Sequence, residues 1–330
     1  MEIQITQDLV QKKSITPNDA GCLKYIEDFL TERGFENEIL TYGRVKNLWS
    51  VKRNNGPLLV FLGHVDVVPT GPENQWEHDP FSGFDDGKFI HGRGTGDMKG
   101  GIACFMAALS RIDTERLNYS IGFLITADEE GPSKDGTVKV VEELQKRNET
   151  IDYCLIGEPS TLETVGDNIR IGRRGSINIE LEVLGKQGHA AYPARVDNPI
   201  HKVVPFLDKL LREVWDEGNE HFPPTSLQLT NISAGVGAHN VTPNNLYLKF
   251  NLRFSTEISG ETIQNKIRNF LDSEGIKHKV SFDINAQPFY SKPKLFTDIV
   301  CKSIEEVQGF KTTLSCSGGT SDGRFISKTG

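Results

Sequence analysis

The chain lacks several features that would point to export, a membrane or disulfide bonds. No run of 18 apolar residues occurs among its 330 residues, so no membrane-spanning helix is expected. The N-terminus, from Met1 to Asp8, has no basic stretch followed by an apolar one, so we expect no export signal. The five cysteines are an odd number without a Cys-x-x-Cys pair, which favours the reducing cytoplasm over an oxidising compartment.

Positive charge is also in short supply. The chain has 37 Lys and Arg against 45 Asp and Glu, which gives a net charge of −8. Because non-specific nucleic-acid binding depends on a basic surface, this balance argues against it. Walker spacing is absent and no Gly-x-Gly-x-x-Gly follows a predicted strand, so nucleotide binding is disfavoured too. An anionic substrate would therefore need a locally basic pocket.

The first half of the chain alternates between buried strands and a helix. Short apolar runs at 57–62, 120–127 and 152–156 predict strands, and apolar residues at helical spacing predict a helix over 99–112. This alternation is typical of an α/β domain with a mostly parallel sheet. The length of 330 residues favours two domains over one.

The pattern changes near residue 175. Four alternating stretches predict half-exposed strands, and two amphipathic stretches predict helices. The strands are expected at 176–184, 226–232, 246–254 and 279–284, and the helices at 198–215 and 260–271. That order, β-α-β-β-α-β, matches a ferredoxin-like α+β arrangement. We therefore expect a second domain at 175–287, inserted into a first domain that is made of residues 1–174 and 288–330.

Acidic and imidazole side chains follow the ends of the predicted strands, where open parallel sheets bind ligands. His64 and Asp66 come directly after the strand at 57–62 and share a face, so the carboxylate can orient the ring of a metal-bound histidine. Taken alone, this pattern is more often structural. Glu158 follows the strand at 152–156, where an unpaired carboxylate would be costly.

Two further acidic clusters flank the predicted helix and another strand. Asp97 lies in a glycine-rich stretch just before the helix, and a helix cap is an equally good interpretation of it. Asp128, Glu129 and Glu130 repel one another unless a cation or a base function compensates, and an exposed acidic loop is the alternative. Together the clusters supply one imidazole and several carboxylates. Such a set suits a divalent cation such as Zn²⁺, and an Asp can bridge two ions.

Seven stretches of the chain resemble known sequences, in order and with normal spacing. They are 63–72 (GHVDVVPTGP), 94–101 (GTGDMKGG), 128–131 (DEEG), 157–160 (GEPS), 172–176 (GRRGS), 187–193 (QGHAAYP) and 318–325 (GGTSDGRF). The first four resemble the di-zinc aminoacylase and carboxypeptidase family. The other three resemble its branch that hydrolyses N-succinyl-L,L-2,6-diaminopimelate to succinate and L,L-diaminopimelate, for lysine and cell-wall synthesis. The resemblance implies a zinc-hydrolase domain with an inserted lid domain that mediates a homodimer.

The resemblance also implies roles for the clustered side chains. The metal ligands would be His64, Asp97, Glu130 and Glu158. The first and last of these would hold one zinc, Glu130 would hold the other and Asp97 would bridge them, with Co²⁺ as a substitute metal. Glu129 would be the general base that deprotonates water, and Asp66 would orient His64. The peptide bond after Asp97 is expected to be cis.

Residues of the inserted domain are implied as substrate contacts. His189 and Asn240 would bind the amide oxygen and stabilise the oxyanion, with His189 reaching the active site of the partner subunit. The remaining contacts would be Arg174, Tyr192, Arg253 and Thr320. Arginine suits a substrate with several carboxylates because its planar fork binds them through paired hydrogen bonds.

One implied element has no counterpart in the sequence. Family members continue further and include a His that completes the second zinc site, whereas this sequence stops at Gly330. The resemblance therefore predicts a weakened second site with only Asp97 and Glu130 as ligands. Two alternatives to the main interpretation stay open. One is acetyl-ornithine deacetylase or general aminoacylase activity by the same chemistry, and the other is a catalytically impaired remnant.

Overall fold

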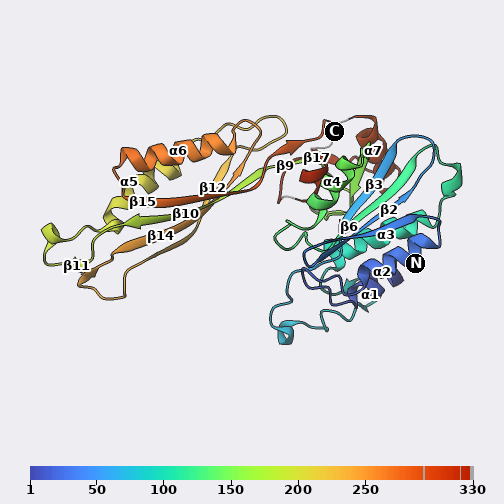
Figure 1. Cartoon of the computed structure of the whole chain (residues 1–330), viewed down its shortest axis with the longest axis horizontal. Helices are drawn as coiled ribbons and strands as arrows, with labels where there is room; N and C mark the ends of the chain where they lie inside the picture. The colour runs from blue at the N-terminus through green and yellow to red at the C-terminus, as the bar shows by residue number, and fades with distance from the viewer. Residues whose placement is uncertain (293, 320, 328–330) are drawn as a thin grey trace. The chain divides into compact units, whose positions relative to one another are not determined.

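The computed structural model describes residues 1–292, 294–319 and 321–327 (Figure 1). Contacts within the chain divide it into two compact units. The first unit holds Met1–Gly166 and the chain from Ser321 onward, and the second holds the segment between them. The domain boundaries expected near residues 174 and 288 stay predictions.

A five-stranded sheet forms the centre of the first unit. Its strands, in spatial order, are β1 (Glu36–Tyr42), β2 (Val45–Lys52), β6 (Ser120–Thr126), β3 (Leu58–His64) and β7 (Tyr153–Ile156). Strand β3 is parallel to β6 and to β7, whereas β1 pairs antiparallel with β2, and β2 pairs antiparallel with β6. The α/β class is confirmed, but the sheet is mixed, so the expectation of a mostly parallel sheet is corrected.

The correction comes from the hairpin that β1 and β2 form. Two residues, Gly43 and Arg44, join the strands, and Gly43 has a φ of 56°, which a tight turn favours in glycine. None of the residues of β1 is fully buried. A strand without an apolar run gives little periodic signal, which is why the sequence did not reveal it.

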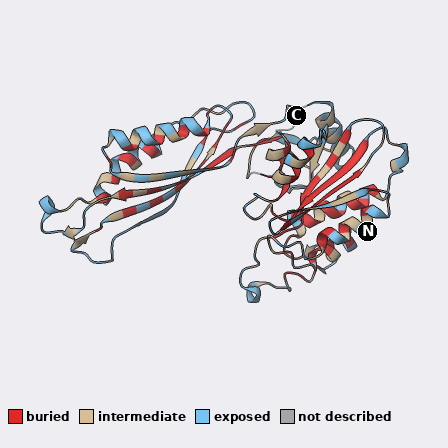
Figure 2. Ribbon diagram, viewed as in Figure 1, coloured by how far each residue is buried: buried red, intermediate tan, exposed pale blue. Residues whose placement is uncertain are grey.

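Helices cover both faces of this sheet (Figure 2). On one face, α1 (Glu2–Val10), α2 (Cys22–Thr31) and α3 (Gly100–Leu109) pack against Phe123 and its neighbours in β6. On the other face, α4 (Thr137–Lys146) and α8 (Gly323–Ile326) pack against Leu124. Successive β6 residues thus bury their side chains in opposite layers, as strand geometry requires. Each such burial stabilises the fold by about 1.5–3 kcal/mol.

Shorter elements connect the main ones in this unit. They are η1 (Glu73–Gln75), β4 (Phe84–Asp85), β5 (Ile90–His91), η2 (Thr95–Lys99) and η3 (Thr114–Arg116). The peptide bond between Asp97 and Met98, inside η2, is cis, and the expectation of a cis bond there is confirmed.

The second unit contains a four-stranded antiparallel sheet with two helices (Figure 1). In spatial order the strands are β12 (Ser226–Ala234), β14 (Asn245–Phe254), β10 (Gly175–Leu184) and β15 (His278–Ala286), and the helices are α5 (Pro199–Arg212) and α6 (Gly260–Ser273). Alternate residues of β10 and β14 are buried against both helices. The predicted β-α-β-β-α-β order of elements is confirmed, whereas the lid and dimerisation roles stay predictions.

The remaining elements of the second unit are short strands that form two-stranded pairs, together with a 3-10 helix and an α-helix. They are β8 (Asn168–Arg170), β9 (Gly172–Arg173), β11 (Gly188–His189), η4 (Pro193–Arg195), β13 (Val241–Thr242), β16 (Phe289–Tyr290), α7 (Leu295–Gln308) and β17 (Thr313–Ser315). Strand β16 pairs with β9, and β17 pairs with β8. In the part of the chain that the structure describes, no helix is both long and apolar enough to cross a membrane.

Candidate metal centre

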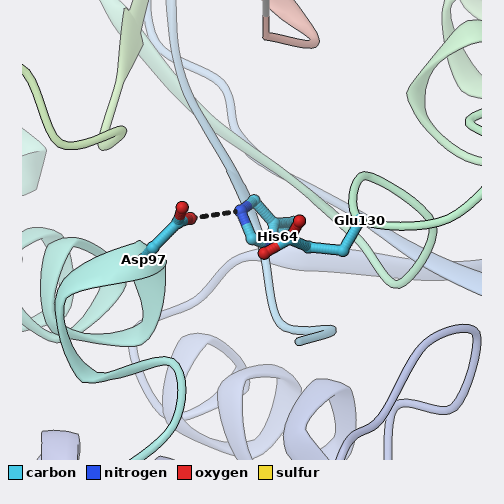
Figure 3. A group of neighbouring side chains, drawn as sticks. All are labelled: His64, Asp97 and Glu130. Atoms are coloured by element: carbon cyan, nitrogen blue, oxygen red, sulfur yellow. Dashed lines mark hydrogen bonds and ion pairs between the residues drawn. The ribbon is translucent and has the colours of Figure 1, made fainter. Parts of the chain in front are cut away.

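Three strand ends and one helix start supply the predicted metal ligands. His64 is the last residue of β3, while Glu130 and Glu158 follow the ends of β6 and β7, and Asp97 lies in η2, just before α3. Because β3, β6 and β7 are parallel, their carboxyl ends meet at one edge of the sheet. Figure 3 shows that the side chains of His64, Asp97 and Glu130 point toward one another.

The distances match a site for divalent cations. His64 Nε2 lies 3.0 Å from Asp97 Oδ1 and 3.7 Å from Glu158 Oε1. One ligand atom from each of His64, Asp97 and Glu130 lies within 4.8 Å of the others, and the same holds for His64, Glu129 and Glu158. Nitrogen and oxygen ligands bind zinc at about 2.0–2.2 Å, so ligand atoms on one tetrahedral ion lie about 3.4 Å apart. The observed spacing therefore fits around a cation.

Asp66 connects the histidine to the acidic loop. Its main-chain oxygen lies 2.9 Å from His64 Nδ1, and because a carbonyl only accepts, Nδ1 carries the hydrogen of this bond. Its carboxylate, which is 3.6 Å from Nδ1, accepts instead from the backbone N–H groups of Glu129 and Glu130, at 3.3 and 3.1 Å. The residue predicted to orient His64 thus also fixes the backbone of both glutamates, and it leaves His64 Nε2 facing the carboxylates.

The electrostatics of the cluster also favour a cation. Burial, together with the charges of Asp322 and Glu158, raises the pKa of Glu129 to about 8. Burial and the charge of Asp97 raise the pKa of Glu130. Burial alone would lower the pKa of His64, but hydrogen bonds with Asp66 and Asp97 outweigh it and raise this pKa well above its usual value. Carboxylates held together in this way repel one another unless a positive charge lies among them.

Asp128, the first acid of the cluster at 128–130, shapes the loop. Its Oδ2 accepts hydrogen bonds from the backbone N–H groups of Lys134 and Asp135, at 2.9 and 3.0 Å. Its own N–H donates to Thr126 Oγ1 at 3.2 Å. Both interactions hold the turn that presents Glu129 and Glu130.

Two glycines allow the segments of the centre to approach one another. A Cβ on Gly63 would lie 2.7 Å from the terminal methyl of Met98, and a Cβ on Gly101 would lie 2.5 Å from the main-chain oxygen of Gly157. Larger residues would push α3 away from the ends of β3 and β7. Close packing of the ligand-bearing segments therefore depends on glycine at these positions.

The predicted substrate contacts His189, Tyr192 and Asn240 lie together in the second unit. His189 pairs with Val241 in the small β11–β13 sheet, and the backbone N–H of Ala190 donates to the main-chain oxygen of Asn240 at 2.9 Å. The rings of His189 and Tyr192 are 5.8 Å apart. All three residues are exposed, so this group can meet a ligand or another protein.

Arg174 and Arg253 form a second group. Arg253 pairs with Ser176, two residues beyond Arg174, so the two arginines flank the start of β10. Burial and the charge of Arg253 lower the pKa of Arg174, and its Nε has no hydrogen-bond partner within the described residues. Two neighbouring guanidinium groups with an unmet donor suit an anion. Thr320, the remaining predicted contact, lies outside the described residues.

The two groups lie at opposite ends of β10. Arg174 immediately precedes this ten-residue strand, and His189 follows it. At 3.3 Å per residue, the strand separates them by about 30 Å. That span far exceeds the length of a small dicarboxylic amide, so Arg174 and His189 of one chain cannot contact the same substrate molecule.

Two buried residues near the centre had no role in the sequence analysis. Asp322, beside α8, is buried close to Arg324, with 3.7 Å between Oδ1 and Nη2, and burial raises its pKa to about 6. Lys99, at the end of η2, is fully buried. The motifs at 94–101 and 318–325 contain both, but sequence does not show whether a charged side chain is buried.

Comparisons with known proteins agree with this geometry. A model of the peptidase family M20/M25/M40 matches residues 60–330. A succinyl-diaminopimelate desuccinylase of Hydrogenovibrio crunogenus is 48% identical over 99% of this chain and 88% of its own length. Among solved structures, an M20 metallo-carboxypeptidase of Sulfolobus solfataricus has a TM-score of 0.82 at 16% identity, covering 98% of this chain and 88% of the other.

A dinuclear metal-binding M20 peptidase of Bacillus subtilis has a TM-score of 0.70 at 15% identity, covering 99% of this chain and 85% of the other. At 15–16% sequence identity, the similarity to these two solved structures shows only that the fold is shared. The family model and the desuccinylase relative, which match most of the sequence, go further. This chain belongs to the peptidase family M20/M25/M40.

Proposed function

We propose that this protein hydrolyses the amide bond of N-succinyl-L,L-2,6-diaminopimelate to succinate and L,L-diaminopimelate, as a cytoplasmic enzyme of amino-acid biosynthesis. The observation that carries the proposal is the convergence of His64, Asp97, Glu129, Glu130 and Glu158 at one sheet edge, in a chain 48% identical to a protein with that activity. Relatives at 44–47% identity over 99% of this chain bear the same name. The acetyl-ornithine deacetylase and aminoacylase alternatives are not favoured by these relatives.

The donor set fits zinc, with Co²⁺ as a substitute. One imidazole nitrogen and several carboxylate oxygens are ligands that zinc accepts. His64 and Glu158 would hold one ion and Glu130 the second, with Asp97 between them. Zinc, when bound, would polarise the amide carbonyl and lower the pKa of a water molecule.

Glu129 is the proposed general base. Its backbone is fixed by Asp66 at 3.3 Å, and its carboxyl has a pKa raised by burial to about 8. A carboxylate beside the attacking water can accept its proton and later return it. Glu129 would take a proton from water as the water oxygen attacks the succinyl carbonyl carbon. It would then pass that proton to the amine nitrogen as the C–N bond breaks.

The second unit is proposed to bind the substrate. Arg174 and Arg253 would bind a carboxylate, which supplies the locally basic pocket that a chain of net charge −8 needs. His189 and Asn240 would donate hydrogen bonds to the amide oxygen and stabilise the developing oxyanion. Tyr192 and Thr320 complete the proposed contacts.

The separation along β10 supports a homodimer. Because Arg174 and His189 of one chain lie at opposite ends of this strand, one substrate cannot meet both within a chain. A symmetric dimer solves the problem if His189 reaches the active site of the partner subunit. The second unit would then serve as both dimerisation domain and lid.

An assay on paired substrates tests the proposal. Zinc-loaded protein should release succinate from N-succinyl-L,L-2,6-diaminopimelate with a kcat/KM at least a hundredfold above that for N-acetyl-ornithine, because only the former offers the second carboxylate of a succinyl group. The Glu129→Gln variant is the matched control, and it should retain zinc. A preference for N-acetyl-ornithine, or no turnover of either amide by protein that holds zinc, would refute the assignment.

A further inference from the structure

Lys99 is a buried cation that the proposed chemistry does not use. Its side chain has no exposed surface, and its Nζ donates to the main-chain oxygens of Leu9 and Lys12, at 2.9 and 3.0 Å. Leu9 lies in the last turn of α1, where the helix dipole favours positive charge, and Lys12 lies two residues beyond the end of the helix. Lys99 therefore connects the loop that carries Asp97 to the end of the first helix.

The same N-terminal segment also contacts the loop that carries His64. Ser14 Oγ donates to the main-chain oxygen of Val65 at 2.6 Å. The backbone N–H of Val67 donates to the oxygen of Ser14 at 2.9 Å, and that of Thr16 donates to the oxygen of Val67 at 3.0 Å. Residues 9–16 thus form hydrogen bonds with both the loop that carries Asp97 and the loop that carries His64.

The arrangement is costly if it serves stability alone. The Lys99 ammonium group is fully buried, and no carboxylate forms an ion pair with it among the described residues. An apolar side chain of similar volume often stabilises a core as well as a buried charge does. Unlike an apolar side chain, an ammonium group forms directional hydrogen bonds, and these hold the two carbonyls at fixed distances from the backbone of Lys99.

We propose that Lys99 is a positioning residue for the metal centre. Through the C-terminal end of α1 and through Ser14, it sets the separation of Asp97 from His64, which is 3.0 Å between Oδ1 and Nε2. It acts through the backbone and touches neither metal nor substrate. The inference rests on the proposed metal dependence.

Metal binding to the Lys99→Met variant tests the inference. Zinc is titrated into metal-free full-length protein, and folding is followed in parallel by chemical denaturation. Substitution of residues that support metal ligands typically lowers metal affinity by about 10–100-fold. Lys99→Met is expected to weaken zinc binding within that range. Lys99→Arg, which keeps the charge, should restore part of the affinity.

Lys52 provides a matched control. Its side chain is 13% exposed, and its Nζ likewise donates to a main-chain oxygen behind a helix, that of Arg33, at 3.0 Å. It pairs with Ile121 at the start of β6, away from the strand ends that carry the ligands. Lys52→Met should lower the free energy of unfolding without changing zinc affinity, which separates a loss of stability from a loss of positioning.

The outcomes are distinguishable. Unchanged zinc affinity in folded Lys99→Met overturns the inference and leaves the proposed function standing. Equal losses in the variants of Lys99 and Lys52 also overturn it, because they indicate a general effect of stability. If Lys99→Met does not fold, Ser14→Ala provides a second variant, because it removes the hydrogen bond from residues 9–16 to Val65. Unchanged zinc affinity in Ser14→Ala would then overturn the inference. Wild-type protein that binds no zinc refutes the proposed function and this inference together, whereas zinc binding without amide hydrolysis refutes only the former.

Discussion

The two units of this chain present their candidate functional side chains in different ways. In the first unit, ligands from four separate segments meet around His64, whose side chain is 1% exposed. In the second unit, His189 and Arg174 lie at opposite ends of one strand, and His189 is exposed. The candidate ligands of the first unit thus converge within one chain, whereas the proposed substrate contacts of the second unit lie at opposite ends of β10.

Parallel strands explain the difference. Strands β3, β6 and β7 end at the same edge, so residues that follow them converge whatever their distance in sequence. The antiparallel pairing of β10 with β14 and β15 instead places successive loops at alternate ends. Residues that follow successive strands of the second unit therefore do not converge at one edge, and the proposed sharing of a site between subunits would bring them together.

The largest expected effect concerns the proposed base. Glu129→Gln should lower kcat by about 10²–10⁴-fold, because an amide cannot accept the proton of the attacking water. Zinc content, measured on the same sample, should stay at the wild-type level. A variant that retains more than a tenth of wild-type turnover would show that Glu129 is not the base.

The next effect concerns how the acidic loop is fixed. Asp66→Asn replaces one acceptor oxygen with an NH₂ group, so either Glu129 or Glu130 loses its backbone partner. Zinc affinity should fall by about 10–100-fold, as expected for partners of metal ligands. Titration of metal-free protein gives the result. The matched control is Asp86→Asn, which removes an exposed acid that pairs with His91 and should leave affinity unchanged.

The smallest effect is a partial recovery of activity in mixed subunits, which tests the second unit directly. His189→Ala and Arg174→Ala should each be nearly inactive, but co-expressed chains should recover about a quarter of wild-type activity, because half of the symmetric dimers are mixed and each has one complete site. Mixing Arg174→Ala with Arg253→Ala should restore nothing, since these residues serve the same site of the same chain. Recovery in both mixtures, or in neither, would contradict sharing of the site between subunits.

Much of the fold and of the metal centre was predictable. The buried run of β6 and the helical spacing in α3 gave clear periodic signals. The acidic and imidazole clusters were evident from their positions beside predicted strands and a helix, whereas the family resemblance supplied their roles as ligands. The hairpin β1–β2 was not predicted: β1 is only half-buried, and polar residues interrupt the apolar residues of β2 although most of that strand is buried. The interactions of Asp66 with the glutamate backbone, and of Lys99 with α1, depend on approaches between distant segments that periodicity does not encode.

The most direct test is to locate zinc in crystals of the metal-loaded protein by anomalous scattering at the zinc edge. The account predicts a peak about 2.0–2.1 Å from His64 Nε2, with oxygens of Asp97 and of Glu130 or Glu158 completing the coordination. A peak elsewhere on the chain, or none, with the carboxylates of Asp97, Glu130 and Glu158 turned away from the ring of His64, would contradict it.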